Sequence, residues 1–181
     1  RSINNLVGFL KANTKKPGGI TVTLKQVASI QKTKITTQDA GSFAIKNRVL
    51  YTAGDLITLY LYVADAISAK SWIGAVAYRN TSMIVFEKTI QDNTKGSGLT
   101  ALVKMETGVM EHETGHLLGL VNNGTKMVLP HEDGKHRFHC QNPACLMYHV
   151  MESGAIINIV DNAIPVLDAN CMHDLAATRK N

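Results

Sequence analysis

The order of the expected elements predicts an α+β fold. Strand-like runs and amphipathic stretches occupy the chain up to about residue 98, a long apolar helix follows at about 99–118, and a short half with little periodicity ends the chain. All seven histidines and all three cysteines lie between His112 and His173, so metal chemistry is expected in the second half and a scaffold in the first. We expect a twisted mixed sheet, a long central helix and a small C-terminal subdomain.

Length and composition limit the class of protein. A chain of 181 residues fits one domain with a hydrophobic core, and 45% apolar with 18% charged residues is typical of a globular chain. The net charge of +5 is spread along the chain without a dense basic block, which argues against nucleic-acid binding. No apolar run approaches the roughly 20 residues of a membrane span. No signal peptide is visible, and Arg1 as the first residue favours a trimmed chain.

The first half carries the expected scaffold. Helices are predicted at Ser2–Asn13 and from Thr37 to about Arg48, from helical spacing of apolar residues and from capping residues. A turn is expected at Lys15–Gly19 and a polar loop at Asp92–Gly98. Strands are predicted from alternating or β-rich runs: Ile20–Leu24, Leu56–Val63, Ile73–Tyr78 and Met83–Glu87.

The second half is expected to be mostly loop. Asn122–Pro143 shows little periodicity, and a loop that long inside a compact domain is usually functional. A closing helix is predicted from Pro165 to about Thr178, because proline suits a first helical turn and apolar residues follow it.

The clearest chemical signal lies at residues 112–119, which read H-E-T-G-H-L-L-G. On a helix, His112 and His116 are four positions apart, so both imidazoles project from one face and can share one Zn²⁺. Glu113 is placed to accept a proton from a water on the metal rather than to bind the metal itself. Gly119 is expected to end the helix and let the chain turn back under the metal.

The residues around this motif favour a metal site over a chance match. Met105 and Val109 precede His112 and His116 at spacings of four, three and four, and other sides of the helix are apolar too. The alternative is a surface helix with two solvated histidines. Buried histidines and a buried glutamate are unfavourable unless something satisfies them, so the apolar surroundings favour a metal.

The order of elements around this helix resembles the metzincin clan of zinc endopeptidases. Metzincins extend the motif to H-E-x-x-H-x-x-G-x-x-H and follow it with a methionine turn. Here the last position is Asn122, a poor zinc ligand, so the third ligand must come from elsewhere or be missing. The resemblance implies a zincin fold with the long helix at the active site, and it makes residues 74–78 look like the edge strand beside the cleft.

The run from His139 to Met147, H-C-Q-N-P-A-C-L-M, resembles the archaemetzincin pattern. In that pattern the third zinc histidine precedes the cysteines and the methionine turn. The resemblance implies that His139 is the third ligand and that Met147 forms the turn, with Tyr148 after it. Asn123–Phe138 would then be an insertion between the glycine turn and the ligand.

Three further histidines need separate interpretations. His131 is the alternative third ligand, whereas His136 and His149 are expected to be exposed loop residues. The segment also resembles a group of bacterial surface-associated metalloproteases, which implies a secreted or cell-surface location. On this reading residues 1–121 form an N-terminal subdomain with the zinc helix, and 122–181 a C-terminal subdomain with the third ligand and the methionine turn.

The cysteines admit two interpretations. In archaemetzincins the two cysteines of this run join a later C-x-x-C to bind a structural zinc, and the corresponding element here is Cys171-Met-His-Asp174. The resemblance implies a second zinc held by Cys140, Cys145, Cys171 and Asp174, with His173 as the alternative fourth ligand. The other interpretation is a Cys140–Cys145 disulfide with Cys171 buried and free. An odd number of thiols mildly favours the metal.

The sequence therefore predicts a zinc-dependent endopeptidase. Peptide bonds of a peptide or protein substrate would be hydrolysed by metal-activated water, with Glu113 as the general base. The substrate would lie extended along the Ile73–Tyr78 strand, and the enzyme is expected to be a monomer. One alternative is a non-catalytic zinc-binding adhesion or structural module on the same fold, which Asn122 keeps open. The other is an aminopeptidase or other amidase.

Overall fold

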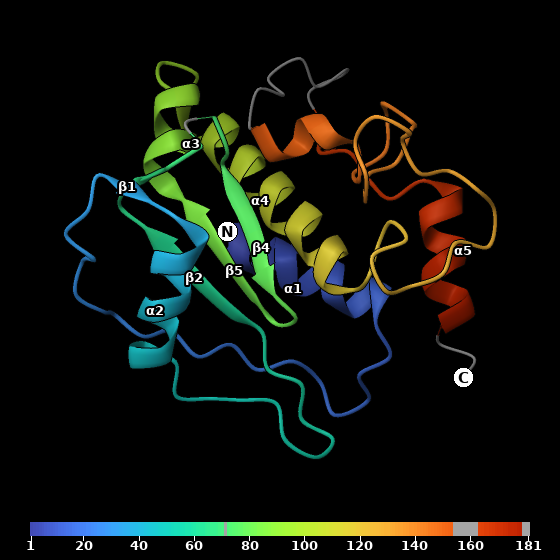
Figure 1. The fold of residues 1–181 in the computed structure, drawn as a ribbon, viewed down its shortest axis with the longest axis horizontal. Coiled ribbons are helices and arrows are strands. Elements are labelled where there is room, and N and C mark those ends of the chain that lie inside the picture. The colour runs from blue at the N-terminus through green and yellow to red at the C-terminus, as the bar shows by residue number, and fades with distance from the viewer. Residues whose placement is uncertain (71, 154–162, 179–181) are drawn as a thin grey trace.

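A mixed sheet forms the centre of the fold. The computed structural model describes residues 1–70, 72–153 and 163–178 (Figure 1). Its three-stranded sheet has the order β2-β5-β4, with β2 at Tyr60–Ala64, β5 at Ser82–Phe86 and β4 at Ala75–Arg79. β2 runs parallel to β5 and β4 runs antiparallel to it, so β4 is an edge strand. A separate parallel pair joins β1 (Lys34–Ile35) to β3 (Ile67–Ser68). The expected α+β class with a mixed sheet is confirmed.

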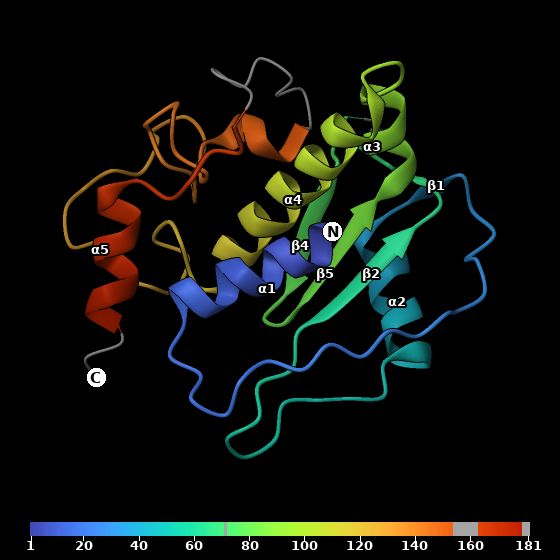
Figure 2. The same ribbon diagram turned by 180° about the vertical axis from the view of Figure 1, so that it is seen from behind.

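Helices cover both faces of this sheet. Alternate residues of β5 point to opposite faces, so Ile84 and Phe86 pack in the cluster that contains Ala40 of α2 (Thr37–Asn47). Val85 packs on the other side with α1 (Ser2–Asn13) and α4 (Gly98–Leu117). Figure 2 shows α1 lying alongside α4, with α1 in front of the sheet in that view. The three predicted helices in this region are confirmed, within two residues at each end.

A further cluster of buried side chains lies next to α4, and all its fully buried members come from residues 120–175. It includes the three cysteines and Met147. Its helical part is α5 (Ala169–Thr178), with the 3₁₀ turn η1 (His149–Ser153) nearby. This cluster supports the loops that carry the metal-ligating residues described below.

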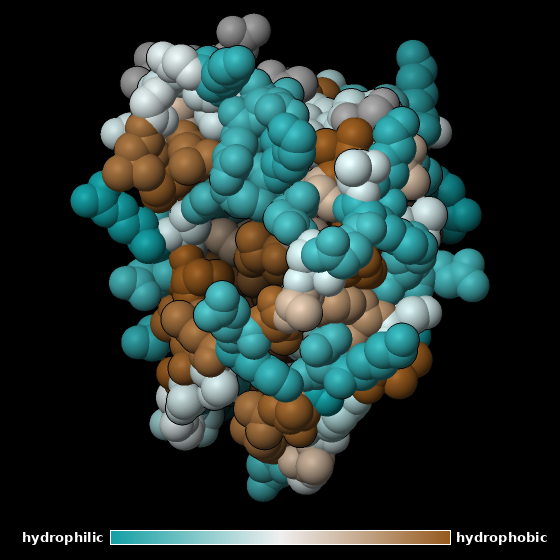
Figure 3. All heavy atoms as spheres, turned by 90° about the vertical axis from the view of Figure 1, so that its left-hand side faces the viewer, coloured by the Kyte–Doolittle hydropathy of each residue, from teal (hydrophilic) through white to brown (hydrophobic). Residues whose placement is uncertain are grey.

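The predicted strand at Ile20–Leu24 is wrong. Residues 17–32 form no strand, and the side chains of Val22 and Leu24 remain 47% and 83% exposed. An alternating pattern specifies a face to bury but not a partner strand, and no strand of the described sheets pairs with this segment. Figure 3 shows several apolar patches on the side of the molecule that lies at the left of Figure 1.

Other element boundaries also moved. The strand expected at Leu56–Val63 begins only at Tyr60, and α3 (Glu87–Asn93) occupies residues expected to be strand end and loop. The C-terminal helix begins at Ala169 rather than at Pro165. Asp168 caps it, since its Oδ1 accepts a 3.0 Å hydrogen bond from the N–H of Cys171.

Gly119 ends the long helix as expected. Its φ of +89° is the left-handed conformation that favours glycine, and the two closing hydrogen bonds of a Schellman motif are present. Leu120 N–H donates to the Gly115 oxygen at 3.0 Å, and Gly119 N–H donates to the His116 oxygen at 3.0 Å. A Cβ at Gly119 would also lie 2.6 Å from the backbone nitrogen of Thr125.

We therefore expect Gly119→Ala to lower the free energy of unfolding by about 1–3 kcal/mol, because it adds left-handed strain and a backbone clash. Urea denaturation followed by circular dichroism measures this. Gly8→Ala is the control: Gly8 lies inside α1 with open space around it, so alanine should leave stability unchanged or raise it by up to about 1 kcal/mol. Equal midpoints for wild type and Gly119→Ala would contradict the role of this turn.

Candidate metal centres

The histidine–glutamate motif lies on the buried side of α4. His112 and Glu113 are 0% and 1% exposed, and His116 is partly buried. Val109 and Met110 of this helix pack against α1 and the sheet, which fixes the position of the helix. The motif residues therefore have little access to bulk water, so their polar atoms need partners within the protein.

Each of three imidazoles hydrogen-bonds through Nδ1 to a backbone carbonyl oxygen: His112 to Leu146 at 2.7 Å, His116 to Leu120 at 3.0 Å, and His139 to Arg137 at 2.9 Å. A carbonyl oxygen can only accept, so Nδ1 carries the proton in each ring. A neutral ring then presents a lone pair at Nε2. Metal-ligating histidines are commonly oriented in this way.

The Nε2 atoms converge on one point. Those of His112 and His116 are 3.1 Å apart, and the ring centroid of His139 lies 5.3 Å and 5.0 Å from theirs. Two lone pairs facing each other at that distance repel unless a cation lies between them. Zinc–nitrogen bonds of about 2.0–2.1 Å in a tetrahedron place ligand atoms about 3.3 Å apart. The donor set and its spacing therefore fit a divalent metal ion.

The protonation states of the two histidines on α4 favour the same interpretation. Burial, together with neighbouring His116, holds the pKa of His112 well below its usual range. Burial also lowers the pKa of His116 to about 4. Both rings are therefore neutral at pH 7, which is the form that binds a metal.

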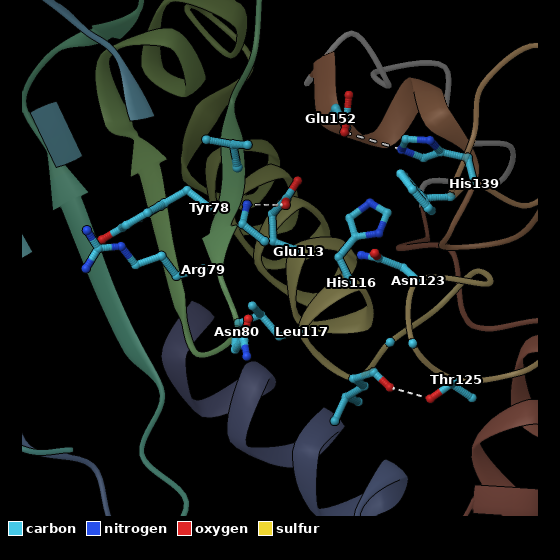
Figure 4. A pocket seen from close by; sticks show the side chains of 16 residues that line it. Tyr78, Arg79, Asn80, Glu113, His116, Leu117, Asn123, Thr125, His139 and Glu152 are labelled. Atoms are coloured by element: carbon cyan, nitrogen blue, oxygen red, sulfur yellow. Dashed lines mark hydrogen bonds and ion pairs between the residues drawn. The ribbon is translucent and has the colours of Figure 1, made fainter. Parts of the chain in front are cut away.

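Glu113 lies between this group and the edge strand. Its Oε2 accepts a 2.6 Å hydrogen bond from the N–H of Ala77 in β4 (Figure 4). Its Oε1 is buried and has no hydrogen-bond partner among the described residues. Burial and the nearby carboxylate of Glu152 raise the pKa of Glu113 well above its usual range. One oxygen thus fixes the side chain, and the other remains available to exchange a proton.

These groups face a cleft of about 610 Å³ between β4 and the C-terminal loops (Figure 4). Glu113 and His116 lie on its floor, with β4 along one wall and His139 and Glu152 along the other. The cleft is lined by Val76, Ala77, Tyr78, Arg79, Asn80, Glu113, His116, Leu117, Leu118, Gly119, Asn123, Gly124, Thr125, Phe138, His139 and Glu152.

Glu152 is a site residue that sequence reasoning missed. It lies in η1, and its Oε1 is 3.3 Å from His139 Nε2, close enough to be a fourth member of the group. Although burial is the largest single influence and acts to lower the pKa of His139, the nearby carboxylate of Glu152 and the backbone hydrogen bonds of the ring together raise it. The only local signal was an acidic residue shortly after the expected methionine turn, which is too common to single out.

Met147 lies directly beneath the motif. It is fully buried, and it approaches α4 so closely that a Cβ at Gly115 would be 2.3 Å from its Sδ. The preceding carbonyl, of Leu146, is the acceptor that orients His112. Tyr148 follows, with its N–H donating to the Cys145 oxygen at 3.0 Å. The loop that contains Leu146 and Met147 therefore packs against α4 beside the two histidines.

Two sequence candidates lie outside this group. Asn122 donates from Nδ2 to Glu132 Oε2 at 3.1 Å. His131, the alternative third ligand, is buried with the cysteines, and its Nε2 is 2.8 Å from Asp174 Oδ2. The residue that joins His112 and His116 is thus His139.

The cysteines form a second candidate metal centre. All three are buried and free, and the Sγ atoms of Cys145 and Cys171 are 3.6 Å apart. His131 Nδ1 lies 3.5 Å from Cys140 Sγ and 4.0 Å from Cys171 Sγ. Hydrogen bonds from the thiols of Cys140 and Cys171 lower the pKa of the Cys145 thiol, which favours the thiolate, the form that binds a metal. Asp168, another residue missed in the sequence, belongs to this group together with His131, Cys140 and Cys171, and its Oδ2 lies 3.3 Å from Cys140 Sγ.

Asp174, expected as the fourth ligand, does not reach the thiols. Its Oδ1 accepts from Val128 N–H at 2.7 Å and its Oδ2 from His131 Nε2 at 2.8 Å, which leaves His131 Nδ1 with its lone pair toward the sulfurs. His173, the other expected candidate, is exposed on α5. The side chains that accompany the cysteines are therefore His131, which Asp174 orients, and Asp168.

Comparisons of the chain with models of protein families, with curated proteins and with solved structures gave no match. Within the described residues, no helix has both the length and the apolar character needed to cross a lipid bilayer. The interpretation of the centres therefore depends on their geometry and on the motifs that form them.

Proposed function

We propose that this chain is a zinc-dependent endopeptidase with a metzincin-like zincin fold. The observation that carries the proposal is the convergence of three imidazole Nε2 atoms, from buried His112 and His139 and partly buried His116, beside Glu113 in a cleft bordered by the edge strand β4. A purely structural site has no need of a buried carboxylate with one unpaired oxygen, and that feature favours catalysis.

His112, His116 and His139 would hold the catalytic zinc. When bound, zinc supplies a Lewis acid that stabilises developing negative charge and lowers the pKa of water to about 7. The ring orientations that favour binding are already set by the three backbone carbonyls. Little reorganisation is then needed to form the site.

Proton transfer is assigned to Glu113 and substrate binding to β4. Glu113 would accept the proton of the attacking water at Oε1 and pass it to the leaving amine, while the bond to Ala77 holds its other oxygen. An extended peptide could pair with the outer edge of β4 as an added strand. A peptide bound there would have its scissile carbonyl close to the histidine group, because β4 contacts Glu113 beside it.

A second candidate is a non-catalytic zinc module, and one observation favours it. Glu152 lies close enough to His139 to serve as a fourth ligand and to close the position that hydrolysis requires. In that case the wild type would cleave no peptide, and Glu152→Ala would release zinc. In an endopeptidase, Glu152→Ala retains zinc.

The endopeptidase proposal is tested with a library of peptides blocked at both ends by acetyl and amide groups. We expect internal cleavage that disappears when a chelator removes zinc and returns when zinc is restored; mass spectrometry of the products identifies the cleaved bonds. Cleavage confined to a second set of the same peptides with a free N-terminus would indicate an aminopeptidase, and no cleavage of the blocked peptides would contradict the endopeptidase proposal.

We also propose a second, structural zinc bound by Cys140, Cys145, Cys171 and His131. Three thiolates and one imidazole form a closed tetrahedral site of a known kind. The residue that the archaemetzincin resemblance placed fourth, Asp174, would instead hold His131 in the correct tautomer.

The two proposed zinc sites can be separated by replacing one histidine from each. We expect His139→Ala to lose one zinc per chain and peptide cleavage, because it removes a ligand from the cleft. When cobalt replaces zinc, the thiolate-to-cobalt absorption of His139→Ala should equal that of the wild type, because the cysteines are unaffected. His131→Ala should alter that absorption instead. If His131→Ala empties the cleft and His139→Ala does not, the ligand assignment is wrong.

A further inference from the structure

A third group of metal-ligating side chains lies outside both centres. His136 Nδ1 is 2.8 Å from Asp133 Oδ2, and His149 Nδ1 is 3.7 Å from the same oxygen. The two imidazole rings are stacked, with centroids 3.6 Å apart and planes 8° from parallel. One nitrogen of each ring and one carboxylate oxygen of Asp133 all lie within 4.8 Å of one another.

The carboxylate is held in place by the backbone. Asp133 Oδ1 accepts a 2.8 Å hydrogen bond from Lys135 N–H, and Asp133 N–H donates to the His139 oxygen at 2.7 Å. His149 was expected to be an exposed loop residue, but it is half-buried at the start of η1. Its Nδ1 is buried and has no hydrogen bond among the described residues, which is unfavourable unless another group binds it.

The donor set selects the kind of ion. Two imidazoles and one carboxylate suit zinc and similar transition metals, whereas calcium and magnesium prefer oxygen ligands only. The separations of 2.8 and 3.7 Å lie on either side of the roughly 3.3 Å expected for neighbouring ligands of tetrahedral zinc. Because the His136 side chain is 43% exposed, water would complete the coordination, and the ion would exchange more readily than one in a buried site.

We propose that Asp133, His136 and His149 form a third, exchangeable divalent transition-metal site that ties the insertion loop to η1. The loop segment leads directly to His139, and the rings of His139 and His149 are 6.4 Å apart. η1 carries Glu152, which lies on the same wall of the cleft as His139. An ion bound here restrains both segments from outside the catalytic centre.

Equilibrium dialysis with elemental analysis tests this site, using Zn²⁺ itself as the probe. The quantity measured is the zinc retained in micromolar free zinc but lost on dialysis into zinc-free buffer. We expect one such equivalent per wild-type chain, and none for His136→Ala or for His149→Ala, since removing an imidazole should weaken binding about tenfold or more. His173→Ala, which removes an exposed histidine on α5, is the matched control and should keep the equivalent.

Amide hydrogen exchange of residues 132–139 gives a second readout. Adding the exchangeable zinc should slow exchange there in the wild type and in His173→Ala, but not in the two site variants. The proposal is overturned if the wild type binds no exchangeable zinc, or if either site variant still binds one exchangeable zinc per chain. The tightly bound zinc of the other two centres is counted separately, so failure of the catalytic assignment would not be mistaken for failure of this one.

Discussion

Glu113→Gln is expected to lower the kcat of peptide cleavage by about two or more decades while the zinc content stays unchanged. Glutamine has the same shape, and its carbonyl oxygen can still accept the hydrogen bond from Ala77 N–H. It cannot take up a proton at neutral pH, so only the proton transfer is removed. Elemental analysis of the same samples used for kinetics verifies that the metal remains.

Glu111→Gln is the matched control for this variant. Glu111 lies on the same helix and its carboxyl is also partly buried, which raises its pKa to about 7. It does not line the cleft. The kcat of Glu111→Gln should therefore stay close to that of the wild type. Equal cleavage by Glu113→Gln and wild type would remove the basis for a general base at this position.

The residues of α4 could be predicted from sequence because their chemistry is local. His112, Glu113 and His116 are arranged by one helix, whose spacing alone puts both imidazoles on one face. Gly119 was predictable for the same reason, since a left-handed glycine ends helices through bonds within a few residues. These elements needed no knowledge of the rest of the fold.

Residues that depend on tertiary structure were predicted less well. His139 came from a motif resemblance rather than from spacing. Glu152 joins the cleft because η1 packs against α4, and nothing near it in sequence indicates that. His131 and Asp174 are 43 residues apart in the chain, so their hydrogen bond could not be read from a C-x-x-D pattern. The strand expected at 20–24 failed similarly, because pairing partners are not encoded locally.

The cysteine centre should have the largest effect on stability. It connects three parts of the chain: the loop before residue 140 with His131, the following loop with Cys140 and Cys145, and α5 with Cys171. Zinc bound to such a site contributes its binding free energy to folding. We expect removal of this zinc to lower the melting temperature by on the order of 10 °C or more, as a step separate from loss of the catalytic zinc.

Three variants distinguish the fourth ligand of this centre. His131→Ala should lose one tightly bound zinc and show the low melting temperature, whereas His131→Cys should retain the zinc, because a fourth thiolate also completes a tetrahedral site. Asp174→Asn keeps an oxygen that can accept from His131, so it should retain the zinc with affinity reduced about 10–100-fold. If Asp174 itself were the ligand, Asp174→Asn would lose the zinc and His131→Ala would retain it. Thiol titration of the denatured, unreduced protein with a chelator present completes the test: three reactive thiols are expected, and a single one would mean that a disulfide occupies the place assigned to zinc.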